Sequence, residues 1–257
     1  MTTGMRRTHD FCWINVMSGE AQKARDFFGK LLHWDFGAMP GVPGGQLILV
    51  GGRVAGALMD LDACALPAGT PPHIGVLIKV DSADAGAAKV NALGGKAEAP
   101  MEVLENGRMV MCSDPNGAVF ALWQAKADAG IDVDGRAHGA PTWFETLTSD
   151  ADRAAEFYGA LFGWTVAEQP MPEATYTLFS LGGEPIAGAM PILPRMGEMK
   201  PHWKTFFAVD DADAAARQAV ALGGTLCMPV QDIPDVGRFG MLQSPQGVAF
   251  YILEYAR

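Results

Sequence analysis

Two closely similar segments decide the fold, FFGKLLHW at residues 27–34 and FYGALFGW at residues 157–164. The match extends outward from them, because seven residues between Trp13 and Trp34 recur at the same spacing between Trp143 and Trp164. An offset of 130 residues that holds over so many positions indicates an internal repeat, which must be recognised before local structure is predicted.

A second pair of segments carries the same repeat further along the chain. Residues 72–95 and 201–224 are identical at 12 of 24 positions, and Gly107-Arg108 later returns as Gly237-Arg238. The sequence therefore predicts a tandem duplication. We expect an N-terminal domain over residues 1–126, a linker over residues 127–140 and a C-terminal domain over residues 141–257.

Each half is expected to contain two β-α-β-β-β units. Ala24, Phe27, Phe28 and Leu31 share one face of a helix, and short apolar runs bounded by glycine-rich turns are typical of strands. In the first half we predict helices at 20–32 and 82–93, and strands at 12–17, 46–50, 54–61, 73–80, 108–112 and 118–123. In the second half we predict helices at 152–161 and 211–222, and strands at 142–147, near 175–190, at 203–209, 239–243 and 248–253.

Composition and charge limit the possible functions. The chain has 257 residues, 49% of them hydrophobic, and a net charge of −10 that divides into −2 for residues 1–128 and −8 for residues 129–257. An acidic surface repels phosphate backbones, so we expect no nucleic-acid partner. No apolar stretch approaches the length of a membrane span, and no secretory signal follows Met1. The four cysteines form no metal or disulfide pattern, so we expect a cytoplasmic protein.

The repeated units resemble the vicinal oxygen chelate superfamily, which includes glyoxalase I, bleomycin-resistance proteins and extradiol dioxygenases. The resemblance rests on the two opening segments and on the Asp-Pro-Asn-Gly turn at 114–117, whose aspartate is replaced by Ser244 in the second half. Residues 141–150 and 232–239 are most similar to the tandem, two-domain glyoxalase-like subgroup. The resemblance implies an α+β fold with a cup-shaped sheet in each domain, and in many members a divalent metal ion in the cup.

The usual ligand positions of the family do not hold metal ligands in this sequence. They fall on Trp13, Gly75 and Ala121 in the first half and on Trp143, Lys204 and Tyr251 in the second. We therefore expect no metal cofactor at these positions. A displaced site that uses His202 and Glu145 is the alternative, because side chains two residues apart share one face of a strand.

The candidate ligand-binding residues are those expected to face the two cups; they are Trp13, Asn15, Trp143, Glu145, Lys204, Arg238 and Tyr251. Glu145 is either a metal ligand or a carboxylate paired with Lys204 or Arg238. His73 and His202 either ligate a metal or form local hydrogen bonds at the start of a strand. Arg108 and Arg238 either face a cup or pair with acidic loop residues such as Glu105 and Asp235. Trp13 and Trp143 either line the cups or fill them.

Three functions remain open at this stage. The first is binding of a small organic molecule in a cup that lacks the usual metal ligands. The second is a metal-dependent lyase or dioxygenase with displaced ligands, and the third is a structural or regulatory protein whose cups are filled. No catalytic residue is assigned, and the chain is expected to be a monomer or a homodimer.

Overall fold

The computed structural model describes residues 7–64, 66–67, 69–127 and 130–256. Each half of the chain builds its own sheet around paired β-α-β-β-β units, which confirms the predicted α+β class. The first half contains β1 (Phe11–Ser18), α1 (Ala21–Leu32), β2 (Asp35–Ala38), β3 (Gly45–Val50), β4 (Arg53–Asp60), β5 (His73–Lys79), α2 (Ala83–Ala92), β6 (Lys96–Ala97), β7 (Met101–Val103), β8 (Gly107–Ser113) and β9 (Val119–Ala125). A short 3₁₀ helix, η1 (Leu61–Ala63), follows β4.

The second half repeats this order. It contains β10 (Pro141–Thr148), α3 (Ala151–Phe162), β11 (Thr165–Pro170), β12 (Thr175–Leu181), β13 (Glu184–Pro191), η2 (Pro194–Met196), β14 (His202–Ala208), α4 (Ala212–Ala221), β15 (Thr225–Ile233), β16 (Gly237–Gln243) and β17 (Ala249–Tyr255). The strand order is β11-β12-β13-β10-β14-β17-β16-β15, which matches β2-β3-β4-β1-β5-β9-β8-β6 in the first half. In each sheet the two units join through antiparallel first strands, β1 with β5 and β10 with β14.

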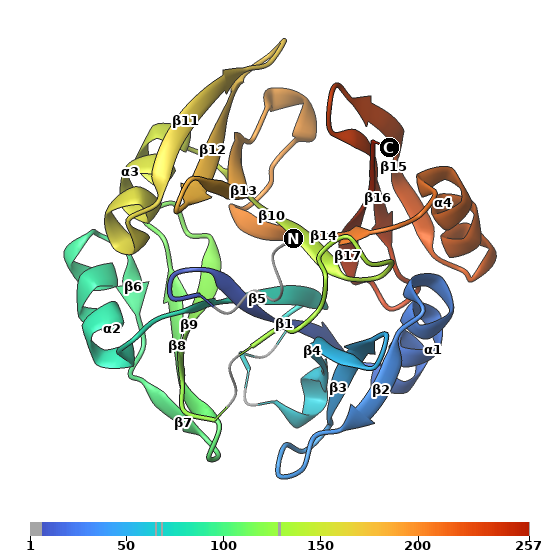
Figure 1. Ribbon diagram of the computed structural model, residues 1–257, viewed down its shortest axis with the longest axis horizontal. Helices are drawn as coiled ribbons and strands as arrows, with labels where there is room; N and C mark the ends of the chain where they lie inside the picture. The colour runs from blue at the N-terminus through green and yellow to red at the C-terminus, as the bar shows by residue number, and fades with distance from the viewer. Residues whose placement is uncertain (1–6, 65, 68, 128–129, 257) are drawn as a thin grey trace.

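The four helices cover the outer faces of the sheets, with α1 beside α4 and α2 beside α3 (Figure 1). The apolar face predicted for the first helix is correct, because Ala24, Phe27, Phe28 and Leu31 are all buried. Helices of one half contact helices of the other. The inner, concave face of each sheet remains free of helices.

The two halves share one hydrophobic core. Phe11 of β1 stacks on Phe144 of β10 with ring centroids 4.0 Å apart. The two repeated tryptophans make equivalent contacts across the halves, since Trp34 Nε1 donates to the Gly139 carbonyl at 2.7 Å and Trp164 Nε1 donates to the His9 carbonyl at 2.8 Å. The duplicated halves are therefore held together by repeat-related interactions.

Five short or exposed strands have no counterpart among the predicted elements: β2, β6, β7, β11 and β15. None of the five strands contains a fully buried residue, and β11 is exposed along its whole length. An alternating apolar pattern arises only where one face of a strand is buried, so these strands carry no such signal. They form through backbone pairing to a neighbouring strand.

The segment predicted as a linker packs against the protein where it is described. Residues 128–129 lie outside the described residues, as do residues 1–6. Ile131, Val133 and Ala140 are buried in the shared core, and Ile131 N donates to the Cys12 carbonyl at 2.9 Å. Within the described ranges, no helix combines the length and the apolar character needed to cross a lipid bilayer.

Candidate functional site

The concave face of the second sheet gathers most of the predicted ligand-binding residues. Side chains alternate along a strand, so Trp143 and Glu145 point to this face, whereas Phe144 points to the core. Glu145 pairs in register with Lys204 of β14 on one side and with Gly188 of β13 on the other. We call the group Trp143, Glu145, Tyr176, Lys204, Phe206 and Tyr251 the C-terminal cup.

A continuous chain of polar contacts crosses the floor of this cup. Trp143 Nε1 donates to the Tyr176 hydroxyl at 3.1 Å, and Tyr176 is in turn hydrogen-bonded to the Glu145 carboxylate. Glu145 Oε1 forms an ion pair with Lys204 Nζ. Both charged side chains are more than nine-tenths buried. Of the two interpretations given for Glu145, the structure confirms pairing with Lys204.

Gly188 makes this arrangement possible. A Cβ atom at position 188 would collide with the hydroxyl of Tyr176, so only glycine leaves room for the ring over β13. Burial and the nearby Glu145 carboxylate raise the pKa of Tyr176 well above its ordinary value. The phenol therefore stays protonated and keeps donating to Glu145 at any pH that the protein experiences in a cell.

Aromatic rings surround the ammonium group of Lys204. Lys204 Nζ lies 4.8 Å from the ring centroid of Tyr251 and 5.9 Å from that of Phe206. These two rings pack on each other at 4.7 Å. Burial, followed by the charge of Glu145, raises the pKa of the Tyr251 phenol. The cup thus combines one paired charge of each sign with a largely aromatic wall.

The concave face of the first sheet has a different character. Trp13 and Asn15 occupy the positions that correspond to Trp143 and Glu145, and Asn15 pairs in register with Gly75. The buried cluster on this face consists of Cys12, Trp13, Ala57, Leu77, Ala121 and Trp123, with four partly buried methionines packed against it. We call this face the N-terminal cup.

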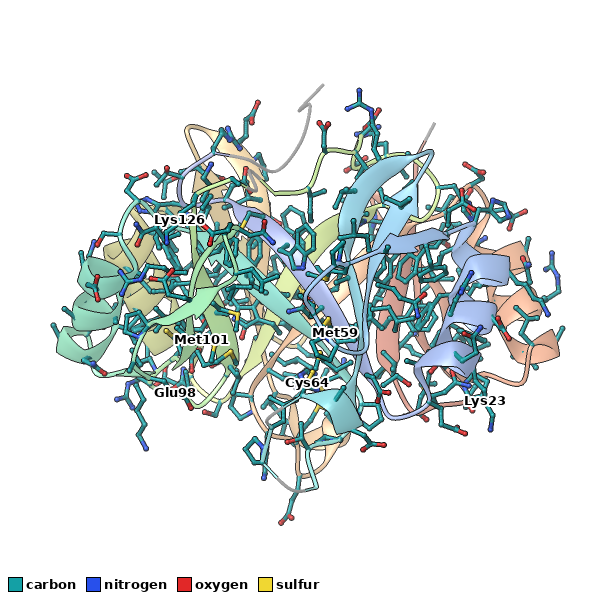
Figure 2. The ribbon with its side chains drawn as sticks, turned by 90° about the horizontal axis from the view of Figure 1, so that it is seen from below. Lys23, Met59, Cys64, Glu98, Met101 and Lys126 are labelled. Carbon is teal, nitrogen blue, oxygen red and sulfur yellow. The ribbon has the colours of Figure 1, made fainter. Side chains whose placement is uncertain are left out.

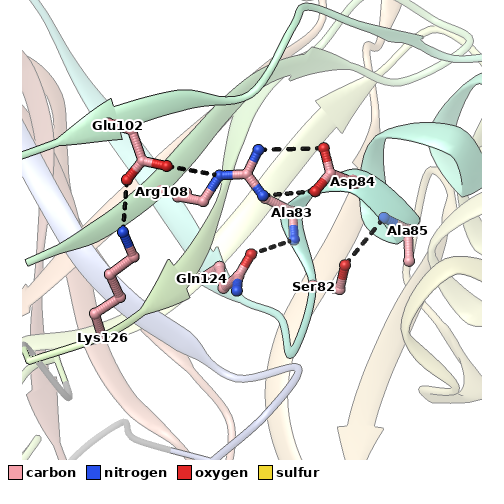
Figure 3. Close-up of polar contacts among 8 residues, drawn as sticks. All are labelled: Ser82, Ala83, Asp84, Ala85, Glu102, Arg108, Gln124 and Lys126. Carbon is pink, nitrogen blue, oxygen red and sulfur yellow. Dashed lines mark hydrogen bonds and ion pairs between the residues drawn. The ribbon is translucent and has the colours of Figure 1, made fainter.

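Arg238 lies outside the C-terminal cup, although it was a candidate for it. It occupies the helix side of β16, where it pairs with Asp213 at 2.5 Å and Asp232 at 3.0 Å. Arg108 makes the repeat-related contacts, to Asp84 of α2 at 2.5 Å and Glu102 of β7 at 3.2 Å (Figure 3).

The partners expected for the two arginines were wrong. Neither pairs with Glu105 or Asp235, because the first turn of the helix packed on the strand places an aspartate closer to each guanidinium. Each aspartate accepts a hydrogen bond from its arginine, which lowers the pKa of Asp84 and of Asp213. The two clusters join helix to sheet, and neither reaches a cup.

The histidines of the repeat form local hydrogen bonds. His73 Nδ1 lies 2.8 Å from the Pro71 carbonyl, and His202 Nδ1 lies 2.8 Å from the Lys200 carbonyl. Burial lowers the pKa of His202, while Lys204 and Glu145 act on it in opposite directions. His202 is therefore neutral near pH 7 and belongs to the edge of the C-terminal cup.

Two open surface pockets are lined by residues outside the two cups. One, of about 280 Å³, is lined by Arg238, Asp232, Asp235, Glu254 and Tyr255 at the ends of β16 and β17. The other, of about 250 Å³, lies between α1 and β2 beside Trp34 and Phe36.

The residues of the C-terminal cup do not fit a divalent metal ion. Across the described ranges, no three His, Cys, Asp or Glu side chains converge as a metal site requires. Lys204 contributes a positive charge beside Glu145, and that carboxylate is already engaged by Lys204 and Tyr176. An ammonium group at this place repels a cation that needs the same carboxylate.

Two of the four cysteines, Cys12 and Cys112, are buried. Burial raises the pKa of Cys112 to about 12, which keeps it protonated near neutral pH.

Comparison with known proteins agrees with this fold. A family model described as "Glyoxalase-like domain" matches residues 143–253. The Mycobacterium tuberculosis protein named "Putative glyoxylase CFP32" is 34% identical over 95% of this chain and 94% of its own length. The chain belongs to the glyoxalase-like family. The Streptomyces peucetius protein named "Anthracycline biosynthesis protein DnrV" is 31% identical to it over 94% of this chain and 92% of its own length.

Several solved structures share the fold of this glyoxalase-like protein. The 2,3-dioxygenase LapB from Pseudomonas sp. KL28 aligns with a TM-score of 0.67 at 14% identity, covering 100% of this chain and 94% of the other. The Mn(II)-bound glyoxalase from Novosphingobium aromaticivorans aligns with a TM-score of 0.66 at 15% identity, covering 96% and 82%. At these identities the likeness concerns the fold alone.

Sequence reasoning missed Tyr176, which completes the polar chain of this glyoxalase-like cup. A signal was available, since Tyr176, Leu178 and Ser180 alternate with Thr177 and Phe179 in the run TYTLFSL. The strand was predicted only as part of a broad region near 175–190. Without its register, the face to which Tyr176 points could not be assigned.

Proposed function

We propose that this glyoxalase-like protein binds a small organic molecule in its C-terminal cup, with Glu145 and Lys204 as the polar anchor. The buried ion pair carries the proposal, because it stands on the concave face where the family usually holds a metal. Burying two charges has a large desolvation cost that apolar residues of similar size would not have. A binding role explains why this position keeps a carboxylate and an ammonium side by side.

The ligand expected from these groups is neutral and carries neighbouring oxygen atoms. A hydroxyl group can donate to Glu145 while an adjacent carbonyl oxygen accepts from Lys204. The pair is neutral as a whole, so a ligand with a net charge would leave one buried charge uncompensated. Trp143, Phe206 and Tyr251 supply flat apolar surfaces that favour an aromatic body.

The names of similar proteins support an aromatic ligand that carries neighbouring oxygen atoms, although they do not bear on its net charge. One relative is named as an anthracycline biosynthesis protein, and one structural neighbour is a homoprotocatechuate 2,3-dioxygenase in complex with 3,4-dihydroxyphenylacetate. These names concern oxygen-bearing aromatic compounds or the pathways that build them. For this chain they support a proposal that the residues of the cup already favour.

The test is a binding screen on the full-length protein. A panel of neutral hydroxy-ketones and ortho-hydroxyaryl ketones, with 2-hydroxyacetophenone as the simplest member, is compared with charged analogues such as salicylate. We expect neutral members to raise the Tm progressively as their concentration increases and to quench tryptophan fluorescence. Glu145→Gln should weaken binding at least about tenfold, because it breaks one charge-assisted hydrogen bond.

A matched control variant distinguishes binding at the Glu145–Lys204 pair from nonspecific binding. Lys200→Met removes an exposed lysine from the same region and should leave binding unchanged. If no panel member binds, or if Glu145→Gln binds as well as the wild type, the proposal fails. Metal analysis of the purified protein tests the alternative: bound Mn²⁺ or Fe²⁺ that is lost in His202→Ala would favour the displaced metal site.

A further inference from the structure

The N-terminal cup places uncharged residues where the C-terminal cup has its ion pair. Asn15 stands at the position of Glu145, and its register partner Gly75 stands at the position of Lys204. Every member of the buried cluster around this pair is apolar. The duplication has thus produced two concave faces with different chemistry.

The floor of the N-terminal cup has free space at Gly75. A Cβ atom at this position would meet only the Asn15 carbonyl oxygen, at 3.9 Å. Gly75 is not among the residues with positive φ, so its backbone would accept a larger residue without strain. In the other cup the place of Gly75 is taken by Lys204, whose side chain fills the same position. Within the described residues, no side-chain atom therefore lies within 4 Å of the point above Gly75 where a Cβ would stand.

Asn15, the register partner of Gly75, brings an amide group beside this space. Asn15 Oδ1 accepts a hydrogen bond from Trp13 Nε1 at 3.0 Å, which fixes the orientation of the carboxamide. Within the described part of the chain, the Asn15 Nδ2 group donates to no other atom, although Asn15 is half-buried. An oriented amide donor above an open floor is suited to a carbonyl oxygen of a ligand.

Methionines and the edges of the sheet enclose the same space. Met39, Met59, Met109 and Met111 pack against the cup cluster, and Figure 2 shows Met59 among the side chains at the middle of the molecule. Leu104, in the turn after β7, lies close to Gly41, in the turn between β2 and β3. A Cβ atom added at Gly41 would stand 3.0 Å from the Leu104 side chain, so these two turns, from opposite edges of the sheet, meet. Thioether side chains adapt to flat apolar surfaces of different shapes.

We propose that the N-terminal cup is a second, independent binding site for a neutral, planar aromatic molecule that carries one carbonyl group. The molecule lies over Gly75 between Trp13 and the methionines, and its carbonyl oxygen accepts a hydrogen bond from Asn15 Nδ2. This site differs from the C-terminal cup in having no charged group at its floor. It does not depend on the function proposed for that cup.

The probe for this test is Prodan, a neutral naphthalene that carries one ketone and whose emission shifts to the blue in an apolar site. We expect saturable binding to the full-length protein with a blue shift. Gly75→Leu fills the floor and should weaken Prodan binding by about tenfold or more, with little change in Tm. Asn15→Ala should weaken it by a smaller factor, since it removes one neutral hydrogen bond.

Variants of the other cup distinguish the two sites. Glu145→Gln should leave the Prodan affinity unchanged, and Gly75→Leu should leave the binding of hydroxy-ketones to the C-terminal cup unchanged. Prodan binding that survives in Gly75→Leu, or that is lost in Glu145→Gln, would overturn the second site. A change in the molecular mass of the protein in solution on Gly75→Leu would also overturn the proposal, because a second copy of the chain would then occupy the cup.

Discussion

At the residue scale, the decisive feature is the position of two charges on the concave face of one sheet. Glu145 and Lys204 are register partners on adjacent strands, so the backbone itself holds them together. Tyr176 is hydrogen-bonded to the Glu145 carboxylate, and the ring of Tyr251 packs against the Lys204 ammonium group. The ligand positions implied by the family resemblance assigned Lys204 and Tyr251 to this cup, and period-two alternation from Trp143 assigned Glu145 to the same face. The sequence could not locate Tyr176, whose strand had no predicted register.

The stability of single and double variants tests the coupling of this pair. Lys204→Met leaves the Glu145 carboxylate buried and unpaired, so we expect the free energy of unfolding to fall by about 3–5 kcal/mol. The double variant Glu145→Gln with Lys204→Met removes both charges and should lose clearly less than Lys204→Met alone. Urea denaturation measures both. A loss in the double variant that equals or exceeds the loss in Lys204→Met would contradict this expectation.

The pH dependence of stability reports on His202. Burial lowers the pKa of this imidazole in the folded protein, whereas in the unfolded chain it titrates near about 6.5. Its contribution to stability is therefore present above about pH 6.5 and is lost as the pH falls through the folded-state value. Unfolding experiments between pH 7.5 and pH 5 should show a smaller loss for His202→Asn than for the wild type.

His73→Asn is the control for this prediction, because His73 occupies the repeat-related position at the start of β5 and makes the same local hydrogen bond. A residual loss is expected in His202→Asn, since burial also lowers the pKa of His9. Identical pH profiles for His202→Asn and the wild type would contradict the assignment.

At the element scale, the repeat preserves helices and central strands while it varies their ends. The helices and the central strands could be predicted, because each buries one face and carries a periodic apolar pattern. The exposed strands β11 and β15 carry no such pattern and were not predicted. Helix starts vary as well: Asp150 Oδ1 accepts from Arg153 N at 3.0 Å at the start of α3, while Glu20 makes no such cap for α1.

This difference gives a matched pair of variants. Asp150→Ala removes a side-chain cap and should lower the free energy of unfolding by about 1 kcal/mol. Glu20→Ala, at the repeat-related position, removes no cap and should change it by less than about 0.5 kcal/mol. Thermal or urea unfolding of both variants measures the difference. Equal effects would mean that capping does not distinguish the two helices.

At the scale of the whole molecule, the duplication has been kept as one packed unit with two unlike cups. A polar chain inside the shared core links the halves, since Tyr158 donates to Asp114 at 3.0 Å and accepts from Trp203 at 3.0 Å. The repeat-related position of Tyr158 is Phe28, so this link exists on one side of the molecule. Trp203 directly precedes Lys204 on β14, with its side chain on the opposite face of the strand.

Removing that hydroxyl tests the link between the halves. Tyr158→Phe leaves the Trp203 indole and one Asp114 oxygen without their partner in a fully buried place. We expect the free energy of unfolding to fall by about 1–3 kcal/mol, in a single cooperative transition because the core is shared. Two separate transitions in the variant or the wild type would show that the halves unfold independently.

A crystal structure with the tightest-binding neutral hydroxy-ketone of the panel would show where the ligand binds. The ligand is predicted to lie on the concave face of the second sheet, with one oxygen within hydrogen-bond distance of Glu145 and another within hydrogen-bond distance of Lys204. Its aromatic ring should contact Trp143 or Tyr251. A ligand bound instead in the pocket beside Arg238, with the Glu145–Lys204 pair untouched, would contradict the account.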